Sequence, residues 1–301
     1  MAESPAIVVC GATGNQGGAV VESLLATSKW KVIALIRDLS AEKACVLEAK
    51  GAQLRKGDLL DKASLVSAFH SVHGVSGVTQ PWSKDYKKAD IASEMLQGKN
   101  ITDACREAGV KHFVFSTVMH FGPARTGVPH LDSKIELEEY AKQCGIPMTL
   151  LQPASFMDNL GQPYFPIQVG KVRGFVDGDA KVPYICCRDI GRIAARVFEE
   201  GESAIGKEIV LISDFVSGRE LCEILSRLRN GDPFRYQSVP KLLMRLFAKE
   251  FYLMRVAFEK SGRPPYPKQL LDALEQCRKR YPEILTAEQF LKLRGFDTKK
   301  L

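Results

Sequence analysis

The chain has 301 residues, of which 45% are hydrophobic and 26% are charged. This composition is typical of a folded globular protein and excludes a disordered, fibrous or collagen-like chain. The formal net charge of +7 lies in residues 240–301, which carry 14 basic and 7 acidic side chains, whereas residues 1–239 carry 28 of each. The neutral main part argues against nucleic acid as a partner, because binding along the phosphate backbone of DNA or RNA requires a basic face.

Short apolar runs alternate with amphipathic stretches along the first half of the chain. The runs predict buried parallel strands at 7–10, 32–36, 53–58, 75–79, 113–118 and 148–151. The stretches predict helices at about 16–27, 40–50, 61–71, 86–108 and 132–144. Six β-α units in series imply an α/β fold with a Rossmann-type, doubly wound parallel sheet. We assign residues 1–152 to this nucleotide-binding domain.

The pattern changes after Pro153. Residues 153–187 are rich in glycine, proline and aromatic residues, and a helix at 189–200, a strand at 208–213, a helix at 218–228 and a proline-interrupted helical tail follow. We expect residues 153–301 to form a smaller, mainly helical region that covers the cleft and is partly interleaved with the sheet. In the tail, leucines alternate with basic residues, which predicts a solvated helix face, with contact to a partner protein or a membrane surface as the alternative.

The eight cysteines are scattered and include no C-x-x-C pair, which predicts free thiols in a reducing compartment. The adjacent Cys186 and Cys187 are expected to fill a strand, with a redox switch as the alternative. The five histidines do not lie at zinc-ligand spacing from a cysteine pair, so no metal site is expected. We expect no signal peptide and no membrane span, and a location in the cytoplasm and also the nucleus.

A glycine-rich loop is the strongest local motif. It follows the first predicted strand, opens the first predicted helix and reads Gly11-Ala12-Thr13-Gly14-Asn15-Gln16-Gly17-Gly18. In this G-x-x-G-x-x-G pattern the first glycine permits a sharp turn, the second lets the backbone approach a pyrophosphate, and the third lets the helix pack on the strand. Because the N–H groups of the helix start face outward, we predict that this loop binds a dinucleotide.

The end of the second predicted strand discriminates between the two nicotinamide cofactors. A carboxylate there would bind the ribose 2′-hydroxyl of NAD(H), but this chain has Arg37, whose planar fork suits the 2′-phosphate of NADP(H). Asp38 is expected to cap the next helix or turn. At the ends of the third and fourth strands, the predicted contacts to adenine and its ribose side are Asp58, Leu59, Thr79, Gln80 and Pro81.

Several motifs together resemble the NmrA-like family, an atypical branch of the short-chain dehydrogenases/reductases. They extend over essentially the whole chain and comprise Gly11–Gly18, Val32–Arg37, Gly57–Leu59, Ala108–Ser116, Lys134, Gly145–Thr149, Pro153–Leu160, Pro183–Ile185, Asp189–Gly191 and Leu285–Phe290. The best-known vertebrate members of that family are described as NADPH-sensing regulators. The resemblance implies NADP(H) as cofactor, with further contacts from Lys134, Pro153, Ala154, Ser155 and Phe156.

The resemblance also exposes a gap in the catalytic machinery. Ordinary members of the superfamily use a Tyr-x-x-x-Lys pair and a serine, whereas this chain reads His130-Leu131-Asp132-Ser133-Lys134. Lys134 is present, Ser116 occupies the place of the serine, and His130 replaces the tyrosine that would deliver a proton. Tyr140 has the wrong spacing to substitute for that tyrosine. His130 is expected to be a helix-entry or surface residue, with a role as the acid as the alternative.

A complete cofactor site beside an incomplete catalytic pair favours an NADP(H)-binding redox-sensor or regulatory protein without efficient dehydrogenase activity. The alternative is an NADPH-dependent reductase of quinone-like or aromatic carbonyl substrates, for which Lys134, His130 and Ser116 are the candidate catalytic residues. Trp82 and Phe156 are expected to line the cofactor cleft or to pack in the core. The expected partners are NADPH, regulatory proteins and a second copy in a homodimer, with no membrane contact.

Overall fold

A computed structural model describes residues 4–82, 89–120 and 125–298 of the chain. The described residues up to 120, together with His130–Gln152 and Cys187–Ile209, form one compact unit. Residues 125–129, Pro153–Cys186 and the described residues from Val210 onward form a second unit.

A seven-stranded sheet with the order β11-β6-β5-β4-β1-β2-β3 forms the centre of the first unit. The pairings among β1 to β6 are all parallel. The strand order reverses between β1 and β4, and ligands of such sheets bind at the carboxyl ends of the strands beside this point. The strands are β1 (Ala6–Val9), β2 (Lys31–Ile36), β3 (Gln53–Lys56), β4 (Gly74–Val78), β5 (His112–Ser116), β6 (Met148–Pro153) and β11 (Glu208–Leu211).

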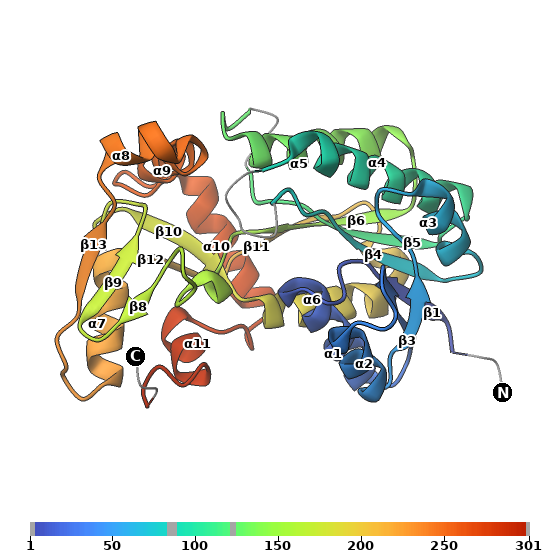
Figure 1. Cartoon of the computed structure of the whole chain (residues 1–301), viewed down its shortest axis with the longest axis horizontal. Helices are drawn as coiled ribbons and strands as arrows, with labels where there is room; N and C mark the ends of the chain where they lie inside the picture. Colours follow the sequence, from blue (N-terminus) through green and yellow to red (C-terminus); the bar gives the residue numbers. More distant parts are fainter. Residues whose placement is uncertain (1–3, 83–88, 121–124, 299–301) are drawn as a thin grey trace. The chain divides into compact units, whose positions relative to one another are not determined.

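Helices cover both faces of this sheet, as Figure 1 shows. On one face lie α3 (Lys62–Phe69), α4 (Ile91–Glu107) and α5 (Pro129–Gln143), and on the other α1 (Asn15–Thr27), α2 (Glu42–Ala49) and α6 (Cys187–Glu200). Phe69, Phe113 and Leu137 are almost completely buried in the core on the first face. On the second face α1 and α6 pack closely because Gly191 has no side chain, and a Cβ there would fall on the carbonyl group of Ala19.

The predicted strands and helices of the first half are confirmed, with differences at their ends. The helix predicted at 132–144 begins at Pro129, because proline suits the first position of a helix, where no N–H bond is lost. The fourth described helix begins at Ile91, and residues 86–88 of its predicted range lie outside the described residues. The strand predicted at 208–213 joins the edge of the sheet beside β6.

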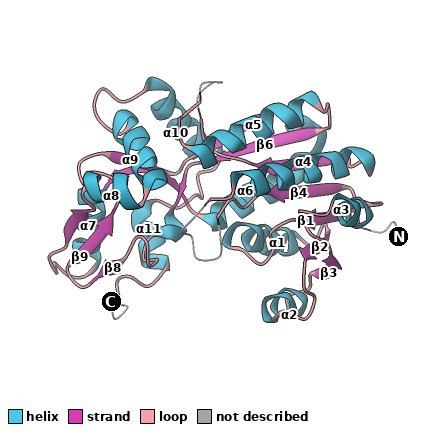
Figure 2. Cartoon of the chain, turned by 45° about the horizontal axis from the view of Figure 1, so that its top comes forward, coloured by secondary structure: helices cyan, strands magenta, loops and turns pink. Residues whose placement is uncertain are grey.

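The second unit combines two three-stranded sheets with five α-helices, and Figure 2 distinguishes its strands from its helices. One sheet has the order β12-β10-β7 and the other β13-β9-β8. In the tail, α8 follows Pro240 and α10 follows Pro267, whereas α8 and α9 meet at Ala248 without a proline. The elements are β7 (Ser155–Phe156), η1 (Met157–Asn159), β8 (Ile167–Gln168), β9 (Lys171–Gly174), β10 (Lys181–Ile185), β12 (Asp214–Ser217), α7 (Gly218–Leu228), β13 (Arg235–Ser238), α8 (Lys241–Phe247), α9 (Lys249–Ser261), α10 (Lys268–Arg280) and α11 (Ala287–Leu293); η2 (Gly201–Ala204) follows α6.

The cysteines form no disulfide within the described part of the chain. Cys186 directly follows β10, and Cys187 is the first residue of α6, and both side chains are buried. Among residues 4–82, 89–120 and 125–298, no group of His, Cys, Asp and Glu side chains is arranged to hold a metal ion. No helix formed by these residues is long and apolar enough to cross a membrane.

Candidate functional site

The glycine loop makes a tight turn between β1 and α1. Gly11 adopts a left-handed backbone with φ +62°, and the N–H of Gly14 donates to its carbonyl oxygen at 2.9 Å. A Cβ at Gly17 would fall on that same carbonyl group, so only glycine allows the helix to start this close to the strand. No side chain caps α1, which leaves its first N–H groups for a ligand. Thr13, Gly14 and Asn15 are exposed, and this cradle fits a pyrophosphate group.

Two cations lie near the adenosine end predicted from the sequence. Arg37 directly follows β2, is exposed and forms no ion pair with the described residues. The second cation is Lys43 on α2, whose Nζ lies 3.5 Å from the carbonyl oxygen of Thr13 in the glycine loop. Lys43 could not be identified from the sequence, because no local pattern links it to a loop 30 residues earlier.

The carboxylate of Asp38, the residue after Arg37, is held by hydrogen bonds within its own turn. Its carboxylate accepts the hydroxyl of Ser40 at 2.6 Å and the backbone N–H of Ser40 at 2.9 Å. These hydrogen bonds from Ser40 hold the pKa of Asp38 below its usual value. The prediction that Asp38 stabilises the next turn is confirmed, although the N-cap of α2 is Ala41.

A row of buried polar side chains on α4 holds the loops that follow β3 and β4. Asn100 Nδ2 donates to the carbonyl oxygen of Leu59 at 2.9 Å. Gln97 binds both backbone groups of Gln80, at 3.0 Å and 3.2 Å. Together with Glu94 these residues recur every three positions, which places them on one helix face. That spacing is the signal by which the sequence could have shown them.

Asp58 makes local structural contacts, and its predicted contact with adenine stays a prediction. Its carboxylate accepts the backbone N–H of Leu60 at 3.0 Å, and its own N–H donates to Ser64 Oγ at 3.0 Å. The segment from Thr79 to Pro81 is held at its other end by the N–H of Asp90, which donates to the carbonyl oxygen of Pro81 at 2.7 Å. Hydrogen bonds within the chain therefore hold both loops.

Lys134 belongs to a buried network rather than standing free at the edge of the sheet. Its Nζ lies 2.7 Å from Glu94 Oε1, 3.0 Å from Thr79 Oγ1 and 3.4 Å from the Thr79 carbonyl oxygen. The second oxygen of Glu94 accepts the hydroxyl of Ser133 at 2.6 Å. Glu94 is fully buried, and the Lys134 side chain is 13% exposed. An ammonium group has three N–H donors, and three acceptors already surround this one.

The other two candidate catalytic residues are also buried. Ser116 ends β5, and its hydroxyl has no hydrogen-bond partner among the described residues. His130 is the second residue of α5, and its ring packs against Trp82 with centroids 5.1 Å apart. The prediction of a helix-entry position is therefore confirmed, but a surface position is wrong, because the helix starts early enough to turn His130 into the interior. Tyr140 donates to Asp103 and takes no part in this group.

A second buried acidic group, which the sequence did not reveal, lies beyond the ends of β5 and β6. Glu138 on α5 is 2.8 Å from His120 Nε2 and accepts Gln152 Nε2 at 3.0 Å. The hydroxyl of Thr117 donates to the other oxygen of Glu138. The side chain of Glu138 is 2% exposed and that of His120 is 11% exposed.

Pro153–Phe156 follow β6 and enter the second unit. Within that unit the N–H of Ala154 donates to the carbonyl oxygen of Leu211 at 2.9 Å, and Ser155 and Phe156 form β7 beside β10. Their predicted contact with the cofactor stays a prediction.

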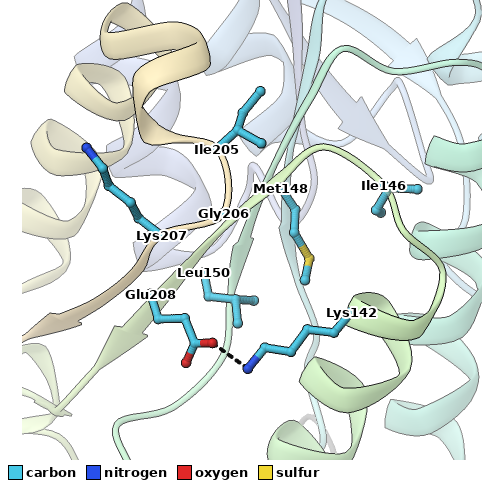
Figure 3. A pocket seen from close by; sticks show the side chains of 8 residues that line it. All are labelled: Lys142, Ile146, Met148, Leu150, Ile205, Gly206, Lys207 and Glu208. Atoms are coloured by element: carbon cyan, nitrogen blue, oxygen red, sulfur yellow. Dashed lines mark ion pairs between the residues drawn. The ribbon is translucent and has the colours of Figure 1, made fainter.

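A cavity of about 290 Å³ lies elsewhere in the first unit, beside β6 and β11. Figure 3 shows Lys142 and Glu208 forming an ion pair at its rim. It extends along the amino-terminal half of β6 from Met148, whereas the glycine loop follows the carboxyl end of β1. The cavity is therefore separate from the candidate site.

The comparisons with known proteins decide the family. A model of the NmrA-like family matches residues 3–291. The chain belongs to the NmrA-like family. The NmrA-like family domain-containing oxidoreductase malD of Malbranchea aurantiaca is 31% identical over 76% of this chain and 74% of malD.

Solved structures share the NmrA-like fold over almost all of the chain. The crystal structure of NmrA, a negative transcriptional regulator, has a TM-score of 0.78 at 22% identity, covering 96% of this chain and 94% of that chain. NADPH-dependent quinone oxidoreductase QOR2 of Escherichia coli, complexed with NADPH, has a TM-score of 0.76 at 24% identity, covering 96% and 99%. NmrA-like proteins thus include both a named regulator and named oxidoreductases.

Proposed function

We propose that this chain binds NADP(H) and is a redox-sensing regulatory protein without efficient dehydrogenase activity. The glycine loop would hold the pyrophosphate, Arg37 and Lys43 the 2′-phosphate, and Asp58, Leu59 and the segment after β4 the adenosine. The complex of the related QOR2 with NADPH supports the choice of cofactor. When bound, this cofactor supplies a hydride for transfer or, in a sensor, a report of the cellular redox state.

The observation that carries the regulatory function is that the partly buried Lys134 ammonium is already engaged by Glu94 and Thr79. In a reductase the lysine lowers the pKa of a neighbouring tyrosine and donates to the ribose of the nicotinamide. Here the tyrosine is replaced by His130, and the Lys134 ammonium already contacts Glu94 and Thr79. Lys134 can donate to a ribose only by giving up one of these contacts. The same lysine instead fixes the loop after β4 against α4 and α5.

A calorimetric titration with NADPH and NADH tests this function. NADPH should bind more tightly than NADH by tenfold or more, because Arg37 and Lys43 would both attract the 2′-phosphate. Limited proteolysis with and without NADPH tests the regulatory part, since a sensor must bind its ligand better in one conformation than in another. Equal affinities for both cofactors, or cleavage patterns that the cofactor leaves unchanged, would contradict the proposal.

An NADPH-dependent reductase of quinone-like or aromatic carbonyl substrates is the second candidate. The name of malD and the quinone oxidoreductase activity in the name of QOR2 favour it. The unpartnered Ser116 hydroxyl and the buried His120–Glu138 pair are groups that could donate a proton. NADPH oxidation against a panel of quinones and aldehydes distinguishes the candidates. Turnover at or above about 1 per second that disappears in Lys134→Ala, with folding checked by circular dichroism, would establish the reductase.

A further inference from the structure

Helix α8 in the second unit exposes four large apolar side chains within six residues. The exposed fractions are 67% for Leu242, 49% for Leu243, 65% for Leu246 and 83% for Phe247. Single exposed apolar side chains are ordinary, but a contiguous group of this kind marks a contact surface. None of these residues belongs to the candidate cofactor site.

The opposite face of α8 is firmly held by α9, and Figures 1 and 2 both show the two helices side by side. Met244 is 3% exposed and lies 4.0 Å from Arg255 Nη1, which donates to the carbonyl oxygen of Val239 at 2.6 Å. Arg255 Nε pairs with Glu259 at 2.6 Å, and Lys241 pairs with the same carboxylate at 2.7 Å. The orientation of α8 is therefore set by buried contacts.

This orientation separates the outward side chains into an apolar side and a basic side. At about 3.6 residues per turn, Leu242 and Leu246 point away from Met244. Leu243 and Phe247 lie on one flank, and Lys241 and Arg245 on the other. Lys249 adds a third exposed cation at the start of α9.

The charge around this face determines what can cover it. Glu250 is the sole acidic residue in the sequence between Val239 and Phe258. Two copies meeting through this face would bring their cations together, so charge complementarity requires an anionic occupant. A partner helix binds in a groove, whereas Leu242, Leu246 and Phe247 project from the surface. Projecting apolar side chains beside Lys and Arg are suited to insertion among anionic lipid headgroups.

We propose that the α8 surface, consisting of Leu242, Leu243, Leu246 and Phe247 with Lys241, Arg245 and Lys249, binds an anionic lipid bilayer as a peripheral contact. The four apolar side chains enter the boundary between headgroups and acyl chains, and Arg245 and Lys249 contact lipid phosphates and carboxylates, while Lys241 keeps its ion pair with Glu259. This favours the alternative of membrane-surface contact over the solvated helix face that the sequence of the tail predicts. It concerns the second unit alone and does not depend on the proposed cofactor role.

Sedimentation of the full chain with lipid vesicles tests the proposal. Vesicles of phosphatidylcholine with about 30% phosphatidylserine should bind the chain, and vesicles of phosphatidylcholine alone should bind it at least tenfold less. Raising the salt from about 0.1 M to about 0.5 M should release most of the bound protein, because salt screens the attraction.

Three variants identify the residues responsible. The double variant Leu246→Glu, Phe247→Glu should lose tenfold or more of the binding to anionic vesicles, and Arg245→Gln, Lys249→Gln should lose the preference for phosphatidylserine. Leu293→Glu is the matched control, because Leu293 is a single leucine on α11 with 57% exposure, and it should bind like the unchanged chain. Circular dichroism verifies that each variant is folded.

Three results would overturn the proposal. The first is absence of binding to anionic vesicles by the folded chain. The second is equal binding of the Leu246→Glu, Phe247→Glu variant. The third is that the chain does not bind vesicles but forms a dimer in light scattering or binds an acidic amphipathic peptide, and that the Leu246→Glu, Phe247→Glu variant loses this association. That outcome assigns the surface to self-association or to a protein partner.

Discussion

The buried pair between Lys134 and Glu94 should contribute far more to stability than the exposed ion pairs of this chain. Lys134→Met leaves the fully buried Glu94 carboxylate with the hydroxyls of Thr79 and Ser133 as its remaining partners. Removing one member of such a pair costs about 3–5 kcal/mol, because the desolvation of the other charge is no longer compensated. The double variant Lys134→Met, Glu94→Gln contains neither charge and should therefore be more stable than the single Lys134→Met variant.

A double-mutant cycle measured by urea unfolding gives the coupling between the two side chains. Both tryptophans, Trp30 and Trp82, lie in the first unit, so their fluorescence follows the unit that contains the pair. We expect a coupling of about 2–3 kcal/mol for Lys134 and Glu94. The control pair Lys50–Glu22 has side chains that are 47% and 57% exposed, and its coupling should be about 0.2–1 kcal/mol.

The reasoning fails if the coupling of Lys134 with Glu94 is no larger than that of the control pair. It also fails if Lys134→Met is as stable as the unchanged chain. Either result would mean that Lys134 is free to serve a substrate or a cofactor, and it would shift the functional conclusion towards the reductase.

Three further predictions concern the cofactor loop and the core. Arg37→Ala should weaken NADPH binding about 10- to 100-fold in calorimetry and leave NADH binding nearly unchanged. The exposed Lys50→Ala is the control and should change neither affinity. A parallel loss of NADPH and NADH binding in Arg37→Ala would contradict the role of Arg37. Gly17→Ala should lower the free energy of unfolding by about 1–3 kcal/mol and impair NADPH binding, because its Cβ meets backbone carbonyls. In the control Gly18→Ala the Cβ would be 3.3 Å from the nearest atom, so the free energy of unfolding and NADPH binding should change less. Burial lowers the pKa of His112 from 6.5 to about 4. Between pH 6.5 and pH 4 the unfolded chain therefore binds a proton at His112 that the native chain does not bind. The free energy of unfolding should fall by up to about 3 kcal/mol as the pH drops through this window. Unfolding of His112→Gln measured from pH 7 to pH 4 should show a weaker pH dependence, and an unchanged one would refute the assignment.

Burial and the neighbouring His73 lower the pKa of His112, and its hydrogen-bond arrangement also disfavours the charged form. The hydroxyl of Thr149 donates to the carbonyl oxygen of Ala204, so it accepts a hydrogen bond from His112 Nε2–H at 2.8 Å. The other ring nitrogen, Nδ1, is buried without a partner among the described residues. Protonation of His112 would place an N–H there with no acceptor, which disfavours the charged form.

The parts of the fold that depend on local sequence could be predicted. Strand and helix periodicity indicated β1 to β6 and the helices between them, and Pro129 alone shifted a boundary by enough to bury His130. The short strands β7 and β8 have two residues each, which is too few for an alternating pattern to show. They form because the neighbouring strands β10 and β9 supply their partners.

By itself the sequence determined the position and geometry of the glycine loop, because a tight turn and a close helix approach require glycine at sites a few residues apart. It also indicated the cation at the end of β2. Only the tertiary structure decided the state of Lys134, since Thr79 and Glu94 lie 55 and 40 residues away from it in the chain and meet it through strand pairing and helix packing. Lys43 and the pair of His120 with Glu138 are likewise contacts across long stretches of chain. Spacing within a motif shows which residues are present, but the packing of α4 and α5 determines which of them remain available for chemistry.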